Sequence, residues 1–199
     1  MKYTPEQARQ KLIAGNKAYM ATGTNPGDVS PKTRRETALA GQRPYAVVLT
    51  CSDSRVPPEH IFSAGIGELF VVRTAGNIVG AFELGSIEYG VAQLHAPLLL
   101  VMGHTQCGAV AAAVEECEEG YIKCVVEEIQ EGLRYPSGEM QAILDNILHS
   151  RDKIMQSETV NRLVSAGSLE IAGAVYNKPE RHLFGSQQDG IGKMSRIGG

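Results

Sequence analysis

The chain has 199 residues, which is enough for one well-buried domain and too few for two ordinary ones. Hydrophobic residues make up 43% and charged residues 21%, a globular balance that excludes the intrinsically disordered class. The net charge of −3, with no Lys/Arg cluster beyond Arg34-Arg35, argues against a nucleic-acid partner. Residues 1–7 lack the apolar core of a signal peptide, and the longest apolar run, residues 96–102, is too short to span a bilayer. We therefore expect a cytoplasmic protein with no membrane partner.

The chain opens with two predicted helices. Thr4-Pro5-Glu6-Gln7 combines a capping residue, a proline suited to the first helical position and a glutamine three residues after the cap. This pattern predicts a helix that runs to about Met20. Ser30-Pro31 predicts the start of a second helix, which ends near Gly41.

Short apolar runs and helical stretches then alternate. Residues 45–50 form a continuously apolar, β-branched run, which is typical of a strand buried on both faces of a parallel sheet. Further strands are predicted at residues 69–73, 98–102 and, more weakly, 169–175. Helical stretches are predicted at residues 80–94, 106–118, 122–133 and 139–166, the last broken once or twice. This alternation predicts an α/β fold with a mainly parallel central sheet flanked by helices.

The expected organisation is a single domain over residues 1–184. Residues 1–41 would form a helical arm and residues 45–184 the α/β core. The glycine-rich residues 185–199 read as a flexible tail.

Reactive side chains follow two of the predicted strands. Cys51 comes directly after the first strand, and His104 and Cys107 follow the third. Ligands of open α/β sheets bind at the carboxyl ends of the strands, so neighbouring strands would bring these three side chains together. Two thiolates and an imidazole suit zinc, and three protein ligands leave one position open, as in a catalytic rather than a structural zinc site.

Asp53 and Arg55 lie beside the first cysteine and have two alternative arrangements. Asp53 could be the fourth zinc ligand, or it could accept a hydrogen bond from a zinc-bound water. The planar guanidinium of Arg55 matches a carboxylate bidentately and could hold Asp53 off the metal. The metal site would be closed if Asp53 binds the zinc and open if Asp53 pairs with Arg55. The plainer alternative is that Asp53 and Arg55 form an ordinary surface ion pair with no role at a metal.

Two further cysteines, Cys117 and Cys124, lie seven residues apart in a predicted helical stretch. No other ligand type accompanies them, so we interpret both as small buried apolar residues.

At the motifs named above the sequence resembles the β-class carbonic anhydrases of the plant-like subgroup. Cys51-Ser-Asp-Ser-Arg55 matches the family's C-x-D-x-R segment, and His104-Thr-Gln-Cys107 matches its H-x-x-C segment. The likeness covers about residues 12–176. The tryptophan of the allosteric subgroup is replaced by Val48.

The resemblance implies one Zn²⁺ per chain and the reversible hydration of CO₂ to bicarbonate and a proton by a zinc-bound hydroxide. It implies that Cys51, His104 and Cys107 are ligands and that the Asp53–Arg55 dyad gates the site. It also implies a homodimer or a dimer of dimers (a homotetramer), with the N-terminal helices packed on a partner subunit. The substrate-binding residues that it implies are Gln42, Phe70, Tyr89 and the backbone N–H of Gly108, with one or more of the first three supplied by the neighbouring subunit. For Phe70 and Tyr89, plain core packing is the alternative.

Three other functions remain open from the residues. A carbonyl sulfide or carbon disulfide hydrolase would use the same ligands. A non-catalytic zinc-binding domain would keep the metal without a reaction. A dinucleotide-binding or thiol-redox protein is disfavoured, because the sequence has no G-x-G-x-x-G after a strand and no C-x-x-C.

Overall fold

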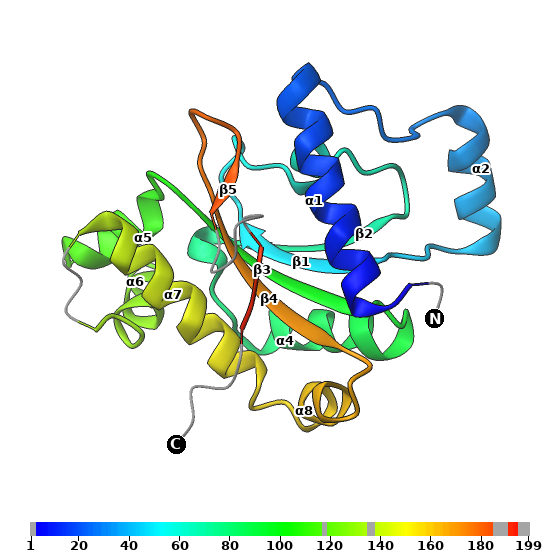
Figure 1. Ribbon diagram of the computed structural model, residues 1–199. Helices are drawn as coiled ribbons and strands as arrows, with labels where there is room; N and C mark the ends of the chain where they lie inside the picture. Colours follow the sequence, from blue (N-terminus) through cyan, green and yellow to red (C-terminus); the bar gives the residue numbers. More distant parts are fainter. Residues whose placement is uncertain (1–2, 117–118, 135–137, 185–190, 195–199) are drawn as a thin grey trace.

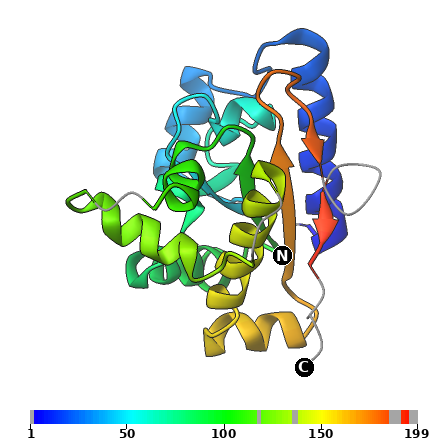
Figure 2. The ribbon, with the colours of Figure 1, turned by 90° about the vertical axis from the view of Figure 1, so that its left-hand side faces the viewer.

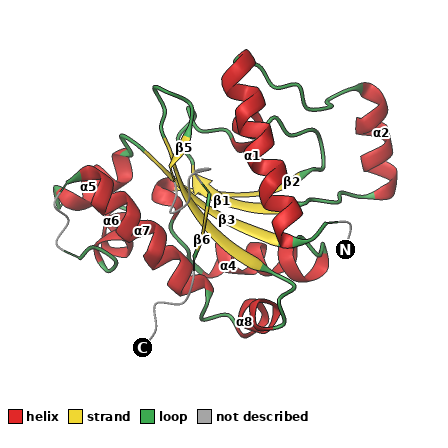
Figure 3. Ribbon diagram, in the orientation of Figure 1, coloured by secondary structure: helices red, strands yellow, loops and turns green. Residues whose placement is uncertain are grey.

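The computed structural model describes residues 3–116, 119–134, 138–184 and 191–194. Within them lies a six-stranded sheet whose first four strands are parallel, in the spatial order β2-β1-β3-β4 (Figures 1 and 3). The parallel strands are β1 (Ala46–Cys51), β2 (Leu69–Thr74), β3 (Leu98–His104) and β4 (Glu170–Tyr176). Two short strands, β5 (Leu183–Phe184) and β6 (Gly192–Lys193), pair antiparallel with β4. The predicted α/β fold with a mainly parallel sheet is confirmed.

Helices cover both faces of the sheet. Figure 2 shows the sheet close to edge-on, with α1 (Pro5–Thr22) to the right of the strands and α7 (Glu139–Ile154) on the opposite side. The remaining helices are α2 (Pro31–Ala40), α3 (Pro58–Ile61), α4 (Ala81–Glu88), α5 (Gly108–Val114), α6 (Ile122–Gln130) and α8 (Glu158–Ser165). A 3₁₀ turn at Ala75–Asn77 follows β2, and a π-helical turn at Tyr89–Gln93 extends α4.

The two N-terminal helices begin where their caps predict. The Thr4 hydroxyl accepts from the Gln7 backbone N–H at 3.2 Å, and the Gln7 side chain accepts from the Thr4 N–H at 2.9 Å. The Ser30 hydroxyl accepts from the Thr33 N–H at 3.2 Å at the start of α2. Helix α2 buries none of its residues and stands apart from the sheet (Figure 1). Its contact with a partner subunit stays a prediction.

The central strands are buried along their whole length, as continuous apolar runs predict. Every residue of β1 and β3 is buried. Strand β2 differs from the prediction, because it is the edge strand of the sheet and buries only Leu69 and Val72 fully. How much of a strand is buried depends on whether it lies at the centre or at the edge of the sheet. That position depends on strand order, which an apolar run alone does not give.

The last long helical stretch breaks once, within the one or two breaks predicted, where Ser157 caps α8 by accepting from the Val160 N–H at 3.1 Å. Two other details depart from the sequence-based expectations. Part of the predicted tail forms β6, whose pairing with β4 joins residues about twenty apart; residues 185–190 and 195–199 lie outside the described residues. Cys124 is exposed, so its interpretation as a buried apolar residue is wrong. Cys117 lies outside the described residues.

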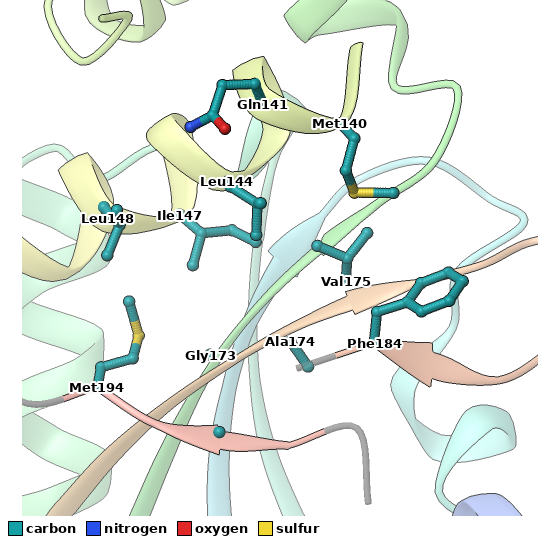
Figure 4. Close-up of a pocket in the computed structure, with 11 residues that line it drawn as sticks. Met140, Gln141, Leu144, Ile147, Leu148, Gly173, Ala174, Val175, Phe184 and Met194 are labelled. Carbon is teal, nitrogen blue, oxygen red and sulfur yellow. The ribbon is translucent and has the colours of Figure 1, made fainter. Parts of the chain in front are cut away.

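An apolar groove runs between α7 and the β4 end of the sheet (Figure 4). Met140 and Leu144 of α7 face Val175 and Phe184 across it, and Met194 closes its other end. The backbone at Gly173 passes close to the Met194 side chain, because a Cβ on Gly173 would lie 2.7 Å from the Met194 sulfur.

Over the described residues, none of the helices combines the length and the apolar character needed to cross a bilayer.

Candidate metal centre

Cys51, His104 and Cys107 meet at the carboxyl end of the sheet. Strands β1 and β3 are hydrogen-bonded neighbours, so Cys51 at the end of one lies beside His104 at the end of the other. Cys107 follows three residues later as the cap of α5. One ligand atom from each side chain lies within 4.8 Å of the other two, and all three residues are buried. The predicted convergence of the two motifs is thus present in the fold.

The imidazole of His104 is oriented for a metal. Its Nδ1 lies 2.9 Å from the carbonyl oxygen of Thr105. A carbonyl can only accept, so Nδ1 carries the proton and Nε2 presents a lone pair. Among the described residues nothing hydrogen-bonds this buried Nε2. A buried polar atom without a partner is costly, and a metal ion held with the two thiols would satisfy it.

The two thiols differ in their protonation. A hydrogen bond from the Cys107 thiol, helped by the N–H groups of Asp53 at 3.4 Å and Gly76 at 3.3 Å, lowers the pKa of Cys51 to about 4. The hydrogen bond to Cys51 and burial raise the pKa of the Cys107 thiol well above its usual range. The metal-free pair therefore carries one thiolate and one thiol at neutral pH.

Zinc binding to the metal-free protein near pH 7.5 is expected to release about one proton per chain from the two thiols, in addition to the proton that zinc-bound water gives up at this pH. Cys51 has already lost its proton above about pH 4, whereas Cys107 has one to lose when the metal binds. Two independent thiols with ordinary pKa values near 8.5 would release about two protons. Calorimetric titration of zinc in buffers of different ionisation enthalpy measures the total release. After the proton from zinc-bound water is subtracted, a remainder of about two would show that the thiols do not share a proton.

Gly76 places a backbone N–H against the sulfur of Cys51. Its φ is +67°, and a Cβ there would lie 2.7 Å from Ile129 Cδ1, so only glycine fits this turn without strain. The buried Asn146 side chain of α7 donates to the Gly76 carbonyl at 2.7 Å. The 3₁₀ turn after β2 is thereby fixed on the metal cluster.

The carboxylate of Asp53 lies next to the cluster and is held by Arg55. Oδ1 accepts from Arg55 Nε at 2.9 Å and from the Arg55 backbone N–H at 2.9 Å, and Oδ2 accepts from Nη2 at 2.6 Å. The Arg55 hydrogen bonds hold the pKa of Asp53 well below its usual range. Asp53 Oδ2 is 3.9 Å from His104 Nε2. Of the two predicted arrangements, this structure contains the one in which Asp53 rests on Arg55.

Gly108 and the three other predicted substrate residues lie at different ends of the sheet. Gly108 is the first residue of α5, next to Cys107, where a backbone N–H has no partner within the helix and an added Cβ would meet nothing within 4 Å. Phe70 and Tyr89 are in contact, with ring centroids 5.9 Å apart. However, Phe70 pairs with Val47, four residues and roughly 13 Å along the strand from Cys51.

Gln42 lies at that same far end of the sheet. A Cβ on Gly67 would lie 3.7 Å from Gln42 Cα, and Arg43 donates to the Gly67 carbonyl at 3.2 Å. One chain therefore does not bring Gln42, Phe70 and Tyr89 to its own metal cluster.

Arg73 and Lys178 support the site and were not predicted. Arg73 of β2 donates through Nε to the Cys51 carbonyl at 2.9 Å and through Nη2 to the Asp53 carbonyl at 2.6 Å. A charge near the carboxyl end of an apolar strand, close to the Cys51 motif, was an available signal for Arg73. Lys178 lies 3.4 Å from Asp53 Oδ2 and comes from the loop after β4, for which the sequence held no comparable signal.

Comparison with known proteins points to the carbonic anhydrases. The carbonic anhydrase family model matches residues 46–181. Carbonic anhydrase 2 of Mycobacterium tuberculosis is 37% identical over 183 residues, which cover 86% of this chain and 88% of the relative. The carbonic anhydrase of Mycolicibacterium smegmatis is 35% identical over 181 residues, covering 84% and 82%.

Solved structures share the fold. The β-carbonic anhydrase CcaA superposes with a TM-score of 0.71 at 24% identity, over 95% of this chain and 93% of the other. One of two tetrameric β-carbonic anhydrases from Sordaria macrospora gives 0.69 at 23% identity, over 90% and 93%. With two buried thiols and a free imidazole nitrogen at one edge of the same fold, the chain belongs to the β-carbonic anhydrase family, a family of carbonate dehydratases.

Proposed function

We propose that the protein catalyses the reversible hydration of carbon dioxide to bicarbonate and a proton, with one Zn²⁺ held by Cys51, His104 and Cys107. The observation that carries the proposal is the buried cluster of two thiols and an unpaired His104 Nε2 in a chain of this family. A zinc ion in such a site supplies a hydroxide nucleophile at neutral pH by lowering the pKa of water.

Direct rate measurements with CO₂, carbonyl sulfide and carbon disulfide on the purified, zinc-loaded protein test this function. We expect CO₂ to be the preferred substrate. A higher kcat/KM for either sulfur compound would assign the chain to a hydrolase on the same scaffold.

The Asp53–Arg55 dyad is proposed to orient the nucleophile and to gate the metal. Because Arg55 keeps Asp53 ionised, the carboxylate remains a hydrogen-bond acceptor beside the cluster at neutral pH. The Arg55 side chain is 60% exposed, so water can replace its hydrogen bonds when it leaves the pair. Loss of the Arg55 hydrogen bonds would remove one restraint on Asp53, and release of its remaining contacts would let it turn towards the metal as a fourth ligand, which would close the site.

The substrate pocket is proposed to form between two copies of the chain. Gly108 would donate its backbone N–H to a substrate or product oxygen at one subunit's metal. Gln42, Phe70 and Tyr89 would come from the partner, because they lie too far from their own cluster. Tyr89 itself is half exposed, and the exposed apolar side chains of Val29, Leu39 and Phe82 also suit an interface.

A mixed dimer tests this shared pocket. Cys107→Ala and Gln42→Ala are each expected to be strongly impaired alone. In a mixed dimer, the metal site of the Gln42→Ala chain would receive an intact Gln42 from the Cys107→Ala chain. Co-expression in equal amounts should then restore about a quarter of the wild-type rate, because half of the dimers are mixed and each has one complete site. Recovery of no activity would mean that Gln42 serves its own subunit.

A homodimer or a dimer of dimers is the assembly proposed here, and the Sordaria macrospora relatives are described as tetrameric. We also propose a cytoplasmic location, because the two ligand thiols need a reducing compartment to stay free of disulfides.

A further inference from the structure

Lys178 is a shielded cation at the metal end of the sheet. Its side chain is 7% exposed. The ammonium donates to the Gln106 carbonyl at 2.9 Å and lies 3.4 Å from Asp53 Oδ2. Removing an ammonium from water is costly unless hydrogen bonds and an opposite charge compensate it. Both kinds of compensation come here from the two loops that carry the metal cluster.

Hydrogen bonds also hold the backbone at Lys178 and in the loop around it. Its own N–H donates to the Thr105 hydroxyl at 3.2 Å. The loop that holds it is closed by Asn177, which donates to the His182 carbonyl at 2.8 Å and accepts from the Arg181 N–H at 2.7 Å. Thr105 in turn donates its N–H to the Tyr176 carbonyl at 3.0 Å. The ammonium therefore reaches Asp53 from a rigid position.

The two cations on Asp53 differ in their exposure to solvent. Arg55 makes more hydrogen bonds, but its side chain is 60% exposed. Solvent and salt weaken a pair of that kind, whereas they weaken a shielded pair much less. His104, the other titratable side chain within 4.0 Å of the carboxylate among the described residues, is 3.9 Å away. Lys178 is thus the partner of Asp53 that persists when Arg55 moves.

We propose that Lys178 is a positioning residue that holds Asp53 turned away from the metal position and so keeps the site open. The proposal rests on the proposed function, because it concerns the same zinc site. It separates the roles of the two cations: Arg55 is the exchangeable partner, and Lys178 is the permanent one. A plainer role would be to clamp the Gln106 loop without acting through Asp53.

Cobalt-loaded protein tests the proposal without an activity assay. Cobalt(II) takes the place of zinc among such ligands, and its visible absorption bands report the coordination. Thiocyanate is titrated as a probe for the open position. Lys178→Met should change the spectrum before any thiocyanate is added, because Asp53 then occupies the metal. Thiocyanate affinity should fall by about tenfold or more, since a hydrogen bond to a charged group is worth about that factor. Lys178→Arg should restore both readouts.

A double variant separates action through Asp53 from direct action on the anion or the loop. In an Asp53→Ala background, Lys178→Met should change thiocyanate affinity by no more than about twofold, because the carboxylate that it restrains is absent. An equal loss with and without Asp53 would overturn the proposal. Lys153→Met is the matched control, since Lys153 also pairs with a carboxylate, Glu128 at 2.6 Å, and should leave the cobalt spectrum unchanged.

The outcomes separate this inference from the proposed function. A normal cobalt spectrum that Lys178→Met does not alter would overturn the role of Lys178 and leave the zinc site intact. A chain that binds no cobalt would overturn both.

Discussion

Cys107→Ser is expected to lose tightly bound zinc and, with it, CO₂ hydration. Serine keeps the size of the side chain but offers a hydroxyl that does not ionise at neutral pH. A structural zinc site is worth about 10–16 kcal/mol over four ligands, so the loss of one ligand should weaken zinc binding by roughly a hundredfold or more. Cys51 and His104 would then be the two ligands left of the cluster, fewer than the three or four protein ligands that zinc sites use.

Competition against a chromophoric chelator measures the zinc affinity, and stopped-flow hydration measures the rate. Cys124→Ser is the matched control, because Cys124 is an exposed thiol outside the cluster. It should retain zinc and activity. Full zinc occupancy together with a wild-type rate in Cys107→Ser would remove Cys107 from the ligand set.

Asp53→Asn is expected to lower kcat/KM by about 10²–10³ while the protein keeps its zinc, the loss typical when one positioned hydrogen-bonding group is removed from an active site. The amide has the same shape as the carboxylate but cannot keep the negative charge that Arg55 and Lys178 hold in place. It therefore cannot accept a hydrogen bond as strongly from the nucleophile. The cluster of Cys51, His104 and Cys107 does not include Asp53, so zinc should remain.

The pattern of lost activity with retained metal separates catalysis from metal binding. Glu127→Gln on α6 is the control, because Glu127 forms an exposed pair with Lys123 at 3.8 Å, and this variant should behave as wild type. If Asp53→Asn hydrated CO₂ at the wild-type rate, the dyad would have no catalytic part. Loss of zinc from Asp53→Asn would instead make Asp53 a resident ligand.

The metal cluster could be predicted from the sequence because its residues follow directly on the strands that position them. Cys51 and His104 each end a continuously apolar run, and such runs form adjacent parallel strands whose carboxyl ends share one edge. The sequence could not decide whether Asp53 binds the metal or pairs with Arg55, because the short loop after Cys51 allows both arrangements. The structure adds the Arg55 hydrogen bonds.

Features that depend on distant parts of the chain were not predictable. Lys178 reaches Asp53 across 125 positions of sequence, through a loop whose path is set by β4 and β5. Strand β6 forms in the predicted tail because β4 has an open edge there. Seven-residue spacing put Cys124 on a helix face but did not say which face meets the core, and that face is exposed.

The pairing of Gln42, Phe70 and Tyr89 with the metal is the one predicted constellation that a single chain does not assemble. Spacing in sequence located these residues relative to Cys51, but strand register places Phe70 at the opposite end of the sheet. A pocket that is completed by a second copy reconciles the two, and the mixed dimer is the way to examine it.

Metal analysis combined with stopped-flow CO₂ hydration on the purified wild-type protein tests the catalytic zinc centre most directly. About one zinc per chain, bound by Cys51, His104 and Cys107, should accompany rapid hydration, and removal of the metal by a chelator should abolish the rate until zinc is restored. Zinc well below about one per chain together with no hydration of CO₂ would contradict it.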